Sequence, residues 1–178
     1  CRMSKTAIIL VSESSLPLAR SIAVIVGAGQ PVPSSQVTIY TKNEMPGCTA
    51  IGHYASFIKD NWDELDAVVF IGAMGICVRS IAAAVRNKYS DPAVVCVDST
   101  GKYVIPVISG HIGGANDLAR SIASALGAEA VVTTQSDNEG LWALDTIGLR
   151  YGWQTEATRA QTNNAVFAFV GRKPTALL

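Results

Sequence analysis

The chain has 178 residues, of which 49% are hydrophobic and 16% are charged. This length holds one large domain, or one domain with an appendage, and the apolar content supports a sizeable core rather than bulk disorder. Its 14 basic and 14 acidic side chains cancel to a formal net charge of zero, which argues against a nucleic acid as the partner, since no chain-wide basic field exists to hold phosphates.

Neither a membrane helix nor a secretory signal is expected. The longest apolar stretches, near residues 66–78 and 103–108, are shorter than the about 20 residues that a membrane helix needs. The segment CRMSKTAIILVSES has no long apolar run before a small-residue cleavage site. Four cysteines without a Cys-x-x-Cys pair indicate core thiols in a reducing compartment rather than a zinc site. We therefore predict a cytoplasmic protein that holds no metal.

Short β-branched runs recur along the chain. TAIILV (6–11) and LDAVVFIG (65–72) are apolar at successive positions, which is typical of strands buried on both faces of a parallel sheet. The turn-rich pentapeptide DSTGK (98–102) predicts a hairpin between the strands that flank it. The predicted strands are 6–11, 36–41, 65–72, 93–97, 103–108, 130–134 and 165–170.

Helical patterns alternate with these strands. After the GAMG turn, apolar residues at helical spacing predict a single buried stripe. That stripe consists of Met74, Cys77, Val78, Ile81, Ala82 and Val85. The predicted helices are 12–29, 48–62, 74–85, 114–126 and 138–152.

The alternation predicts an α/β fold, with a mostly parallel open sheet covered by helices on both faces and one hairpin. The pattern weakens from Trp153 onward. We expect residues 1–152 to form the α/β domain that carries the glycine turns. Residues 153–178 are expected to be the truncated start of a following segment.

Ligands of open α/β sheets bind outside the carboxyl ends of the strands. Four loops would share that edge if the strands are parallel: Ser12–Ser15, Gly72–Gly75, Ser109–Asn116 and Thr133–Asp137. Two of these loops, in IGAMGI and SGHIGGAN, are glycine-rich helix starts that would offer unpaired N–H groups to an anion or carbonyl. The alternative is that these glycines serve packing alone.

Three side chains in or beside these loops could carry chemistry. His111 can transfer a proton near neutral pH, Arg79 can pair with a carboxylate, and Asp137 can orient an imidazole. Each has a structural alternative: a turn histidine, a surface arginine and a helix cap. His53 is interpreted as a surface residue.

The segments VVFIGAMGICVRSIA, KYSDPAVVCVDSTGKYVIPVISGHIGGANDLARSIASALGA and AVVTTQSD closely resemble the cobalamin-biosynthesis protein G family, the cobalt-precorrin-5A hydrolases. The resemblance is dense from Asp66 to Asp137 and looser elsewhere. It implies a step of the anaerobic route to vitamin B12, in which the ring-A δ-lactone of a cobalt corrinoid is opened and acetaldehyde is released. The cobalt is carried by the substrate, and no cofactor held by the protein is expected.

The loops suggest a mechanism for such a substrate. His111 would activate water, backbone N–H groups of a glycine turn would stabilise the oxyanion, Arg79 would clamp a carboxylate arm, and Asp137 would orient His111 or the water. The predicted substrate-binding residues are Ser12, Gly72, Ala73, Met74, Gly75, Ser109, Gly110, Gly113, Gly114, Asn116 and Thr134.

Two departures from the family pattern leave alternatives open. Family members often have Thr where this chain has Met74, and they continue into a separate C-terminal domain. Some members are fused to a corrinoid methyltransferase. The expected partners are therefore that C-terminal domain or a fused methyltransferase. The chain could therefore hold the corrinoid without catalysis, or be a binder of small anions. No nucleic acid or membrane is expected as a partner.

Overall fold

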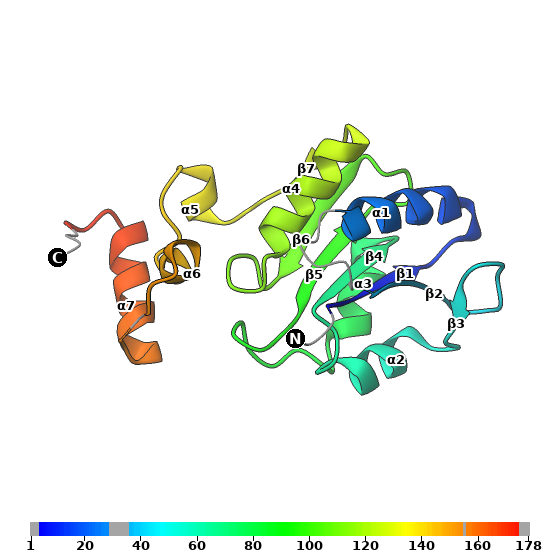
Figure 1. Cartoon of the computed structure of the whole chain (residues 1–178), viewed down its shortest axis with the longest axis horizontal. Coiled ribbons are helices and arrows are strands. Elements are labelled where there is room, and N and C mark those ends of the chain that lie inside the picture. The colour runs from blue at the N-terminus through cyan, green and yellow to red at the C-terminus, as the bar shows by residue number, and fades with distance from the viewer. Residues whose placement is uncertain (1–3, 29–35, 155, 175–178) are drawn as a thin grey trace. The chain divides into compact units, whose positions relative to one another are not determined.

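The computed structural model describes residues 4–28, 36–154 and 156–174. The chain divides into two compact units, Cys1–Val131 and Val132–Leu178. Within the described residues, all seven strands belong to the first unit, and the second unit contains three helices (Figure 1). The boundary predicted after residue 152 separates the α/β domain from the start of a following segment, and it stays a prediction.

The first unit is built on one seven-stranded sheet with the order β3-β2-β1-β4-β5-β6-β7. Strands β1 to β5 run parallel, β6 runs antiparallel to β5, and β7 runs parallel to β6. The bounds are β1 Lys5–Leu10, β2 Gln36–Thr41, β3 Thr49–Ala50, β4 Ala67–Ile71, β5 Ala93–Val97, β6 Tyr103–Ile108 and β7 Glu129–Ala130.

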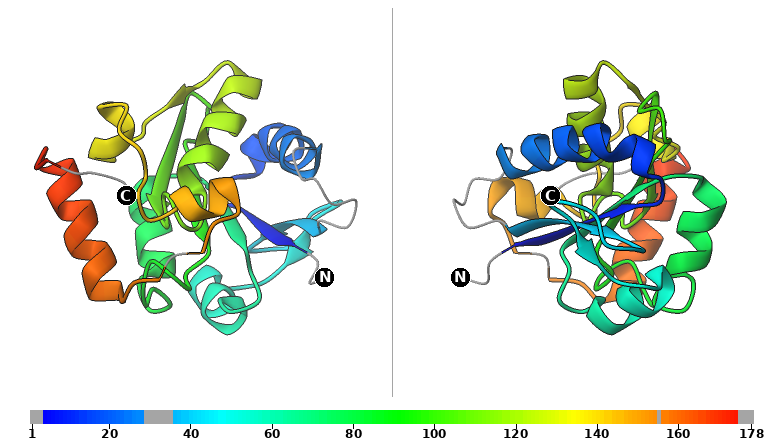
Figure 2. Two further views of the ribbon diagram at one scale, coloured as in Figure 1. Left: turned by 60° about the vertical axis from the view of Figure 1, so that its left-hand side comes forward. Right: turned by 90° about the vertical axis from the view of Figure 1, so that its right-hand side faces the viewer.

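Helices cover both faces of this sheet, as Figure 2 shows for α1 and α2. One face packs against α1 and α4, and the other packs against α2 and α3. Every residue of β4 and β5 is buried, because helices lie on both sides of these central strands. The bounds are α1 Leu16–Ala28, preceded by the 3-10 turn η1 Glu13–Ser15, α2 Tyr54–Asn61, α3 Met74–Ile81 and α4 Ala115–Leu126.

The predicted α/β architecture and its hairpin are confirmed. Strands 36–41, 93–97 and 103–108 have the predicted bounds. The predicted helix 12–29 begins later, at Leu16, and its last residue, Gly29, lies outside the described residues. The helix predicted at 74–85 ends at Ile81, and its predicted apolar stripe is only partly buried. Cys77 and Ile81 are buried, whereas Val78 is 46% exposed and Val85, which lies beyond the helix, is 42% exposed.

Three predictions near the end of the chain are wrong. The strand predicted at 130–134 is limited to Glu129–Ala130. The helix predicted at 138–152 is split into α5 (Gln135–Asn138) and α6 (Ile147–Tyr151), because Gly140 adopts a left-handed conformation with φ +64°. The strand predicted at 165–170 is the second half of helix α7 (Arg159–Val170).

Local capping explains α7. Thr158 accepts a hydrogen bond from the backbone of Gln161, and the Gln161 side chain binds the backbone of Thr158 in return. This capping box stabilises a helix start, and the apolar run after it continues the helix although no residue of α7 is buried. Among the described residues, no helix combines the length and the apolar character needed to cross a membrane.

Candidate functional site

The loops that follow β1 and β4 lie side by side at the carboxyl edge of the parallel strands. The chain passes from β1 to β2 and β3 on one side, and then crosses to β4 on the other side of β1. A reversal of strand order of this kind opens a crevice where open α/β sheets bind ligands. The N–H of Val11 donates to the carbonyl of Ile71 at 3.2 Å, which joins the two loops at this point.

The turn after β4 is shaped to bring backbone donors to this crevice. A Cβ on Gly72 would lie 2.8 Å from Cγ2 of Val11, so a larger residue would push the two loops apart. Ala73, the N-cap of α3, is extended and provides no side-chain cap. Within the described part of the chain, the N–H groups of Met74 and Gly75 donate no hydrogen bond. Together with the helix dipole, these two donors favour an anion or a polarised carbonyl oxygen.

Serine hydroxyls line the neighbouring loop. The Oγ atoms of Ser12 and Ser14 lie 2.9 Å apart, and Ser12 is only partly exposed. The buried Ser15 hydroxyl donates to the carbonyl of Ser99 at 2.9 Å. The loops that follow β1, β4 and β5 are thus tied together around one edge.

The buried thiols of Cys96 and Cys77 lie next to each other in the core, and that of Cys96 binds the Gly72 turn. Cys96 on β5 donates to the carbonyl of Gly72 at 3.5 Å. A hydrogen bond with Cys96, together with burial, raises the pKa of the Cys77 thiol on α3. The same hydrogen bond lowers the pKa of Cys96, but both thiols are almost fully buried, so neither is accessible as a nucleophile and the pair is structural. The prediction of core cysteines is confirmed for these two residues; Cys48 is half-buried, and Cys1 lies outside the described residues.

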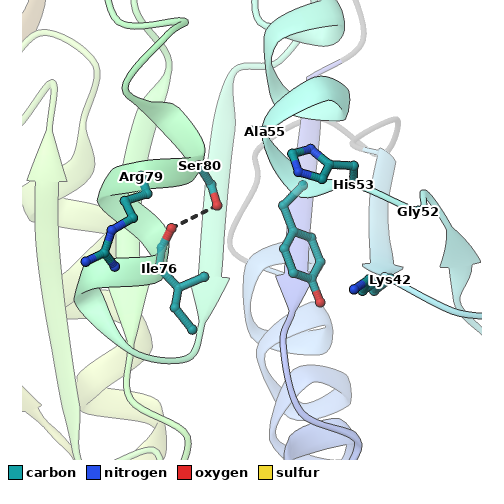
Figure 3. Close-up of a pocket in the computed structure, with 8 residues that line it drawn as sticks. Lys42, Gly52, His53, Ala55, Ile76, Arg79 and Ser80 are labelled. Atoms are coloured by element: carbon teal, nitrogen blue, oxygen red, sulfur yellow. Dashed lines mark hydrogen bonds between the residues drawn. The ribbon is translucent and has the colours of Figure 1, made fainter.

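A pocket of about 310 Å³ lies between α2 and α3 (Figure 3). It is lined by Lys42 after β2, by His53 at the start of α2, and by Arg79 on α3. Figure 3 shows the Arg79 guanidinium on the side of α3 away from α2, where it donates to the carbonyl of Gly75 at 3.1 Å. No acidic residue lines the pocket among the described residues, so its local charge is positive although the chain is neutral.

Tyr54 connects this pocket to the end of β1. Its hydroxyl donates to the carbonyl of Leu10 at 3.2 Å. Burial raises the pKa of Tyr54, and a backbone hydrogen bond from Lys42 partly opposes that shift. Tyr54 therefore remains a protonated phenol at neutral pH and acts as a donor that holds the first turn of α2 against the sheet.

The second glycine turn, before α4, differs from the first because its backbone donors are already used. The N–H of Ala115 donates to the carbonyl of Ser109 at 3.1 Å, and that of Asn116 donates to Gly110 at 3.0 Å. The expectation that both glycine turns present unpaired N–H groups is therefore wrong for these two donors. The chain closes this turn with its own carbonyls.

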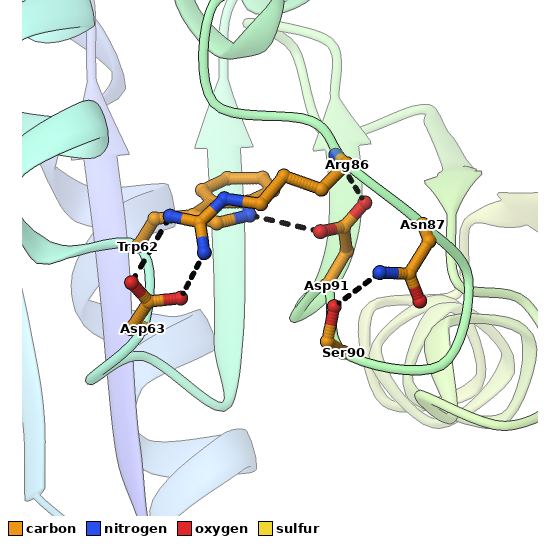
Figure 4. A network of polar contacts seen from close by, with 6 residues as sticks. All are labelled: Trp62, Asp63, Arg86, Asn87, Ser90 and Asp91. Atoms are coloured by element: carbon orange, nitrogen blue, oxygen red, sulfur yellow. Dashed lines mark hydrogen bonds and ion pairs between the residues drawn. The ribbon is translucent and has the colours of Figure 1, made fainter.

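Packing explains the glycine at position 113. A Cβ there would lie 2.5 Å from Cβ of Ser109. Ser109 itself is buried with φ +57°, a conformation that L-residues rarely adopt, and its hydroxyl donates to the carbonyl of Asp91 at 3.0 Å. The carboxylate of Asp91 accepts from Nε1 of Trp62 at 3.1 Å and from the N–H of Arg86 at 2.9 Å (Figure 4).

His111 lies on the edge of the sheet opposite to Arg79. β6 runs antiparallel to β5, so the loop that leaves β6 meets the amino ends of β1, β4 and β5. A second pocket, of about 380 Å³, confirms this placement, because Gly113 and Gly114 line it together with Thr6 and Ala93 at those amino ends. The expectation that the Ser109–Asn116 loop shares an edge with Ser12–Ser15 and Gly72–Gly75 is therefore wrong.

The remaining predicted residues, Thr134 and Asp137, belong to the second unit. Thr134 is the N-cap of α5, and Asp137 lies in the first turn of that helix. Their roles stay predictions. Across the described residues, no group of three or more His, Cys, Asp or Glu side chains is arranged to hold a metal ion.

The family model described as cobalamin synthesis G N-terminal matches residues 56–137. This range contains both glycine turns, Arg79 and His111. The matched region belongs to the cobalamin-synthesis G family.

Individual proteins agree with this membership. The chain is 46% identical over 99 residues to a cobalt-precorrin-5A hydrolase of Salmonella typhimurium, covering 56% of this chain and 28% of that protein. A cobalt-precorrin-5A hydrolase of Priestia megaterium is 40% identical over 111 residues, covering 62% of this chain and 30% of that protein. The chain thus spans less than a third of the length of these two curated relatives.

A solved structure shares the fold. The protein, from Sulfolobus solfataricus and described as a cobalamin biosynthesis protein G homologue, superposes with a TM-score of 0.57 at 28% identity. The superposition covers 72% of this chain and 36% of that one. The family's N-terminal α/β architecture therefore extends to this chain.

Sequence analysis missed two residues that line the cationic pocket. Lys42 follows a predicted strand, and His53 precedes a helix, but nothing near either residue in sequence suggests chemistry. Their meeting depends on the pairing of β2 with β3 and on the hydrogen bond from the N–H of Gly52 to the carbonyl of Lys42, at 3.0 Å. The only available signal was the position of Lys42 at the carboxyl end of a strand.

Proposed function

We propose that this chain takes part in cobalamin biosynthesis as part of a cobalt-precorrin-5A hydrolase. The observation that carries the proposal is the 46% identity over 99 residues to a protein of that name. The reaction proposed is the hydrolytic opening of the ring-A δ-lactone of cobalt-precorrin-5A with release of acetaldehyde, in the anaerobic route. The cobalt belongs to the substrate.

The geometry at the β1/β4 crevice suits a lactone. The unpaired N–H groups of Met74 and Gly75 can donate to a carbonyl oxygen, and the interaction strengthens as that oxygen becomes an oxyanion. Ser12 and Ser14 supply hydroxyl donors from the adjacent loop. Arg79, one turn further along α3, can pair with a carboxylate of the substrate.

His111 is separated from these donors by the length of the strands. A single reacting carbonyl at the β1/β4 crevice would not also contact His111 from the opposite edge. General-base catalysis by His111 therefore requires the lactone at the amino edge, beside Gly113 and Gly114, whereas oxyanion stabilisation by Met74 and Gly75 requires it at the carboxyl edge. We propose the carboxyl edge, where backbone donors are unoccupied.

This separation favours a second candidate function. The chain could hold the corrinoid while other parts of a longer protein supply the base, since the matched relatives are more than three times as long as the aligned segment. In that case this chain binds the substrate without turnover.

Binding and turnover can be measured together on the 178-residue chain. Cobalt-precorrin-5A is titrated while acetaldehyde release is assayed in the same samples. Release that is lost on Met74→Pro and kept on His111→Ala supports hydrolysis at the carboxyl edge. Binding without release supports the holding role. Release that survives Met74→Pro and stops on His111→Ala would overturn the choice of edge, and absence of binding would contradict the proposed function.

A further inference from the structure

The pocket at the amino edge of the sheet, of about 380 Å³, is lined by residues of α1 and α4. Its floor is a row of small side chains on three neighbouring strands, because Thr6 pairs in register with Ala67, and Ala67 pairs with Ala93. Small side chains at this register leave space between the sheet and the two helices that cover it. The volume is enough for a small organic ligand.

The hydroxyl of Thr6 is a buried polar group without a partner. Thr6 is only 4% exposed. It lies on the same face of β1 as Ile8 and Leu10, which pack towards α1 and α4, so its side chain points to the pocket. Within the described residues this hydroxyl forms no hydrogen bond, and its oxygen is not fully enclosed. Since an unpaired buried hydroxyl is unfavourable, Thr6 is available to a ligand that enters the pocket.

The carboxylate of Asp66 lies close to Thr6. Its Oδ2 accepts from the N–H of Lys5 at 2.8 Å, which places it one residue before Thr6 along β1. The N–H of Asp66 donates to the carbonyl of Lys5 at 2.9 Å, so Asp66 is fixed against the start of that strand. Across the described part of the chain, Oδ1 of Asp66 accepts no hydrogen bond and the carboxylate forms no ion pair.

The charge in this pocket is negative. Among the described residues that line it, Asp66 and Asp117 are the only charged ones. Asp117 contributes less, because its side chain is 91% exposed and lies 3.4 Å from the guanidinium of Arg120. It also lies in the first turn of α4, where it offsets the positive end of the helix dipole. The pocket therefore favours a cation over an anion.

The walls are apolar. They consist of the side chains of Ile25, Val26 and Leu118. An ammonium group carries three donors and no acceptor, which matches the hydroxyl oxygen of Thr6 and the free oxygen of Asp66. A short alkyl chain attached to it would pack against the apolar walls.

We infer that this pocket binds a small aliphatic amine in its protonated form. The ammonium group is held by Thr6 and Asp66, and the alkyl chain lies between α1 and α4. The pocket is at the opposite edge of the sheet from the Gly72 turn, so this inference does not depend on the proposed function, and either can fail without the other.

Three probes with the same alkyl group separate the head-group chemistry from apolar burial: n-butylammonium, n-butanol and butyrate. Each is titrated into the 178-residue chain, and the backbone N–H signals of Thr6, Ala67 and Gly114 are followed. We expect n-butylammonium to give saturable shifts at all three residues and to bind more tightly than n-butanol. Butyrate should bind most weakly, since Asp66 repels it.

Two variants of nearly unchanged shape remove the proposed contacts. Thr6→Val deletes the hydroxyl and should weaken n-butylammonium about fivefold. Asp66→Asn keeps an oxygen for the N–H of Lys5 but removes the charge, and should weaken n-butylammonium by up to about fivefold while leaving n-butanol unchanged. The matched controls are Thr6→Ser, which keeps the hydroxyl, and Asp60→Asn, an exposed residue of α2 that does not line the pocket. Both should bind n-butylammonium like the unaltered chain.

Folding is checked separately from binding. Because Thr6→Val removes an unpaired hydroxyl, its midpoint of urea denaturation should equal or exceed that of the unaltered chain. Weaker binding by a Thr6→Val chain of unreduced stability, restored in Thr6→Ser, supports the site. Butyrate that binds as tightly as n-butylammonium overturns the cationic chemistry. The site is also overturned if no probe gives saturable shifts, or if Thr6→Val and Asp66→Asn bind n-butylammonium undiminished.

Discussion

The two glycine turns of the first unit look alike in sequence and differ in what they leave open. Before α4, the carbonyls of Ser109 and Gly110 occupy the N–H groups of Ala115 and Asn116. Before α3, the N–H groups of Met74 and Gly75 have no acceptor within the described residues. A glycine-rich helix start is therefore not enough to indicate a ligand site; the carbonyls that face the helix start decide whether donors remain.

The closed turn before α4 requires an unfavourable backbone conformation at Ser109. Ser109 adopts φ +57°, which typically costs about 1–3 kcal/mol for a residue other than glycine. In exchange, its carbonyl binds the N–H of Ala115 and its hydroxyl binds the carbonyl of Asp91. The turn before α3 contains no non-glycine residue with positive φ among the described residues, and its donors stay free.

Proline substitutions at the first residue of α4 and at the first residue of α3 should show the largest difference in stability between the two turns. Ala115→Pro removes an occupied donor and follows Gly114 at φ +81° and ψ +16°, a conformation unsuited to a residue before proline. We expect a loss of about 3 kcal/mol or more in the free energy of unfolding, measured by urea denaturation.

Met74→Pro is the matched change at the other turn. Ala73, at φ −70° and ψ 136°, already has a conformation compatible with a following proline, and proline is tolerated at the first helical position. We expect a loss of about 1 kcal/mol, from the truncated Met side chain, and a severalfold weaker affinity for an anionic ligand. Equal destabilisation by the two prolines would contradict the difference between the turns.

Adding a methyl group at Gly113 should destabilise the closed turn. The new Cβ would lie 2.5 Å from Cβ of Ser109 and 2.9 Å from its carbonyl oxygen, so we expect Gly113→Ala to cost about 3 kcal/mol. The control is Gly27→Ala within α1, where no atom lies within 4 Å of the added Cβ. That variant should be slightly more stable, by up to about 1 kcal/mol. Thermal unfolding of both variants measures the contrast.

The anchor of the closed turn can be tested at Asp91. Asp91→Ala leaves the buried indole N–H of Trp62 and the N–H of Arg86 without their acceptor, which should lower the free energy of unfolding by about 2 kcal/mol. Hydrogen exchange should show faster opening of the 109–116 loop than of the 72–75 turn. Uniform acceleration across both turns would argue against a local anchor.

A smaller effect is expected at Asp98, in the hairpin beside the open turn. Burial alone would raise the pKa of Asp98, but hydrogen bonds from Thr100, Tyr103 and Lys102 lower it below its usual value. Because the folded-state pKa is depressed, the stabilisation is present above the unfolded pKa of about 3.9 and is lost as pH falls through the folded value.

Asp98→Asn should therefore cost about 1 kcal/mol at neutral pH. The difference between the two proteins should shrink below about pH 4, where the carboxyl group itself becomes protonated. Urea denaturation at a series of pH values measures this difference. A cost that does not change between neutral and acidic pH would contradict the role of the carboxylate.

Much of the fold could be predicted because the central strands are buried on both faces. β4 and β5 appear in sequence as uninterrupted apolar runs, which helices on both sides require. The direction of β6 was also available, since the hairpin predicted at DSTGK already reverses the chain. The prediction that the His111 loop shares an edge with the Gly72 turn did not take that reversal into account.

The end of the chain shows the opposite case. AVFAFV is a short apolar run that contains Val and Phe, residues favoured in strands, yet Thr158 and Gln161 start a helix that continues through it. The Thr-x-x-Gln spacing was a readable capping signal. The pocket between α2 and α3 could not be predicted in the same way, because the residues that line it come from three separate elements and share a pocket only through tertiary packing.

The most direct test of the choice of edge is a map of backbone N–H shifts. The 178-residue chain is titrated with a cobalt corrinoid that carries free carboxylate arms, and the shifts at the two glycine turns are compared. We predict that the signals of Gly72, Met74 and Gly75 move with saturation, while those of Gly110, Gly113 and Gly114 stay in place. Saturable shifts confined to Gly110–Gly114 would place the ligand at the amino edge, beside His111, and contradict the assignment.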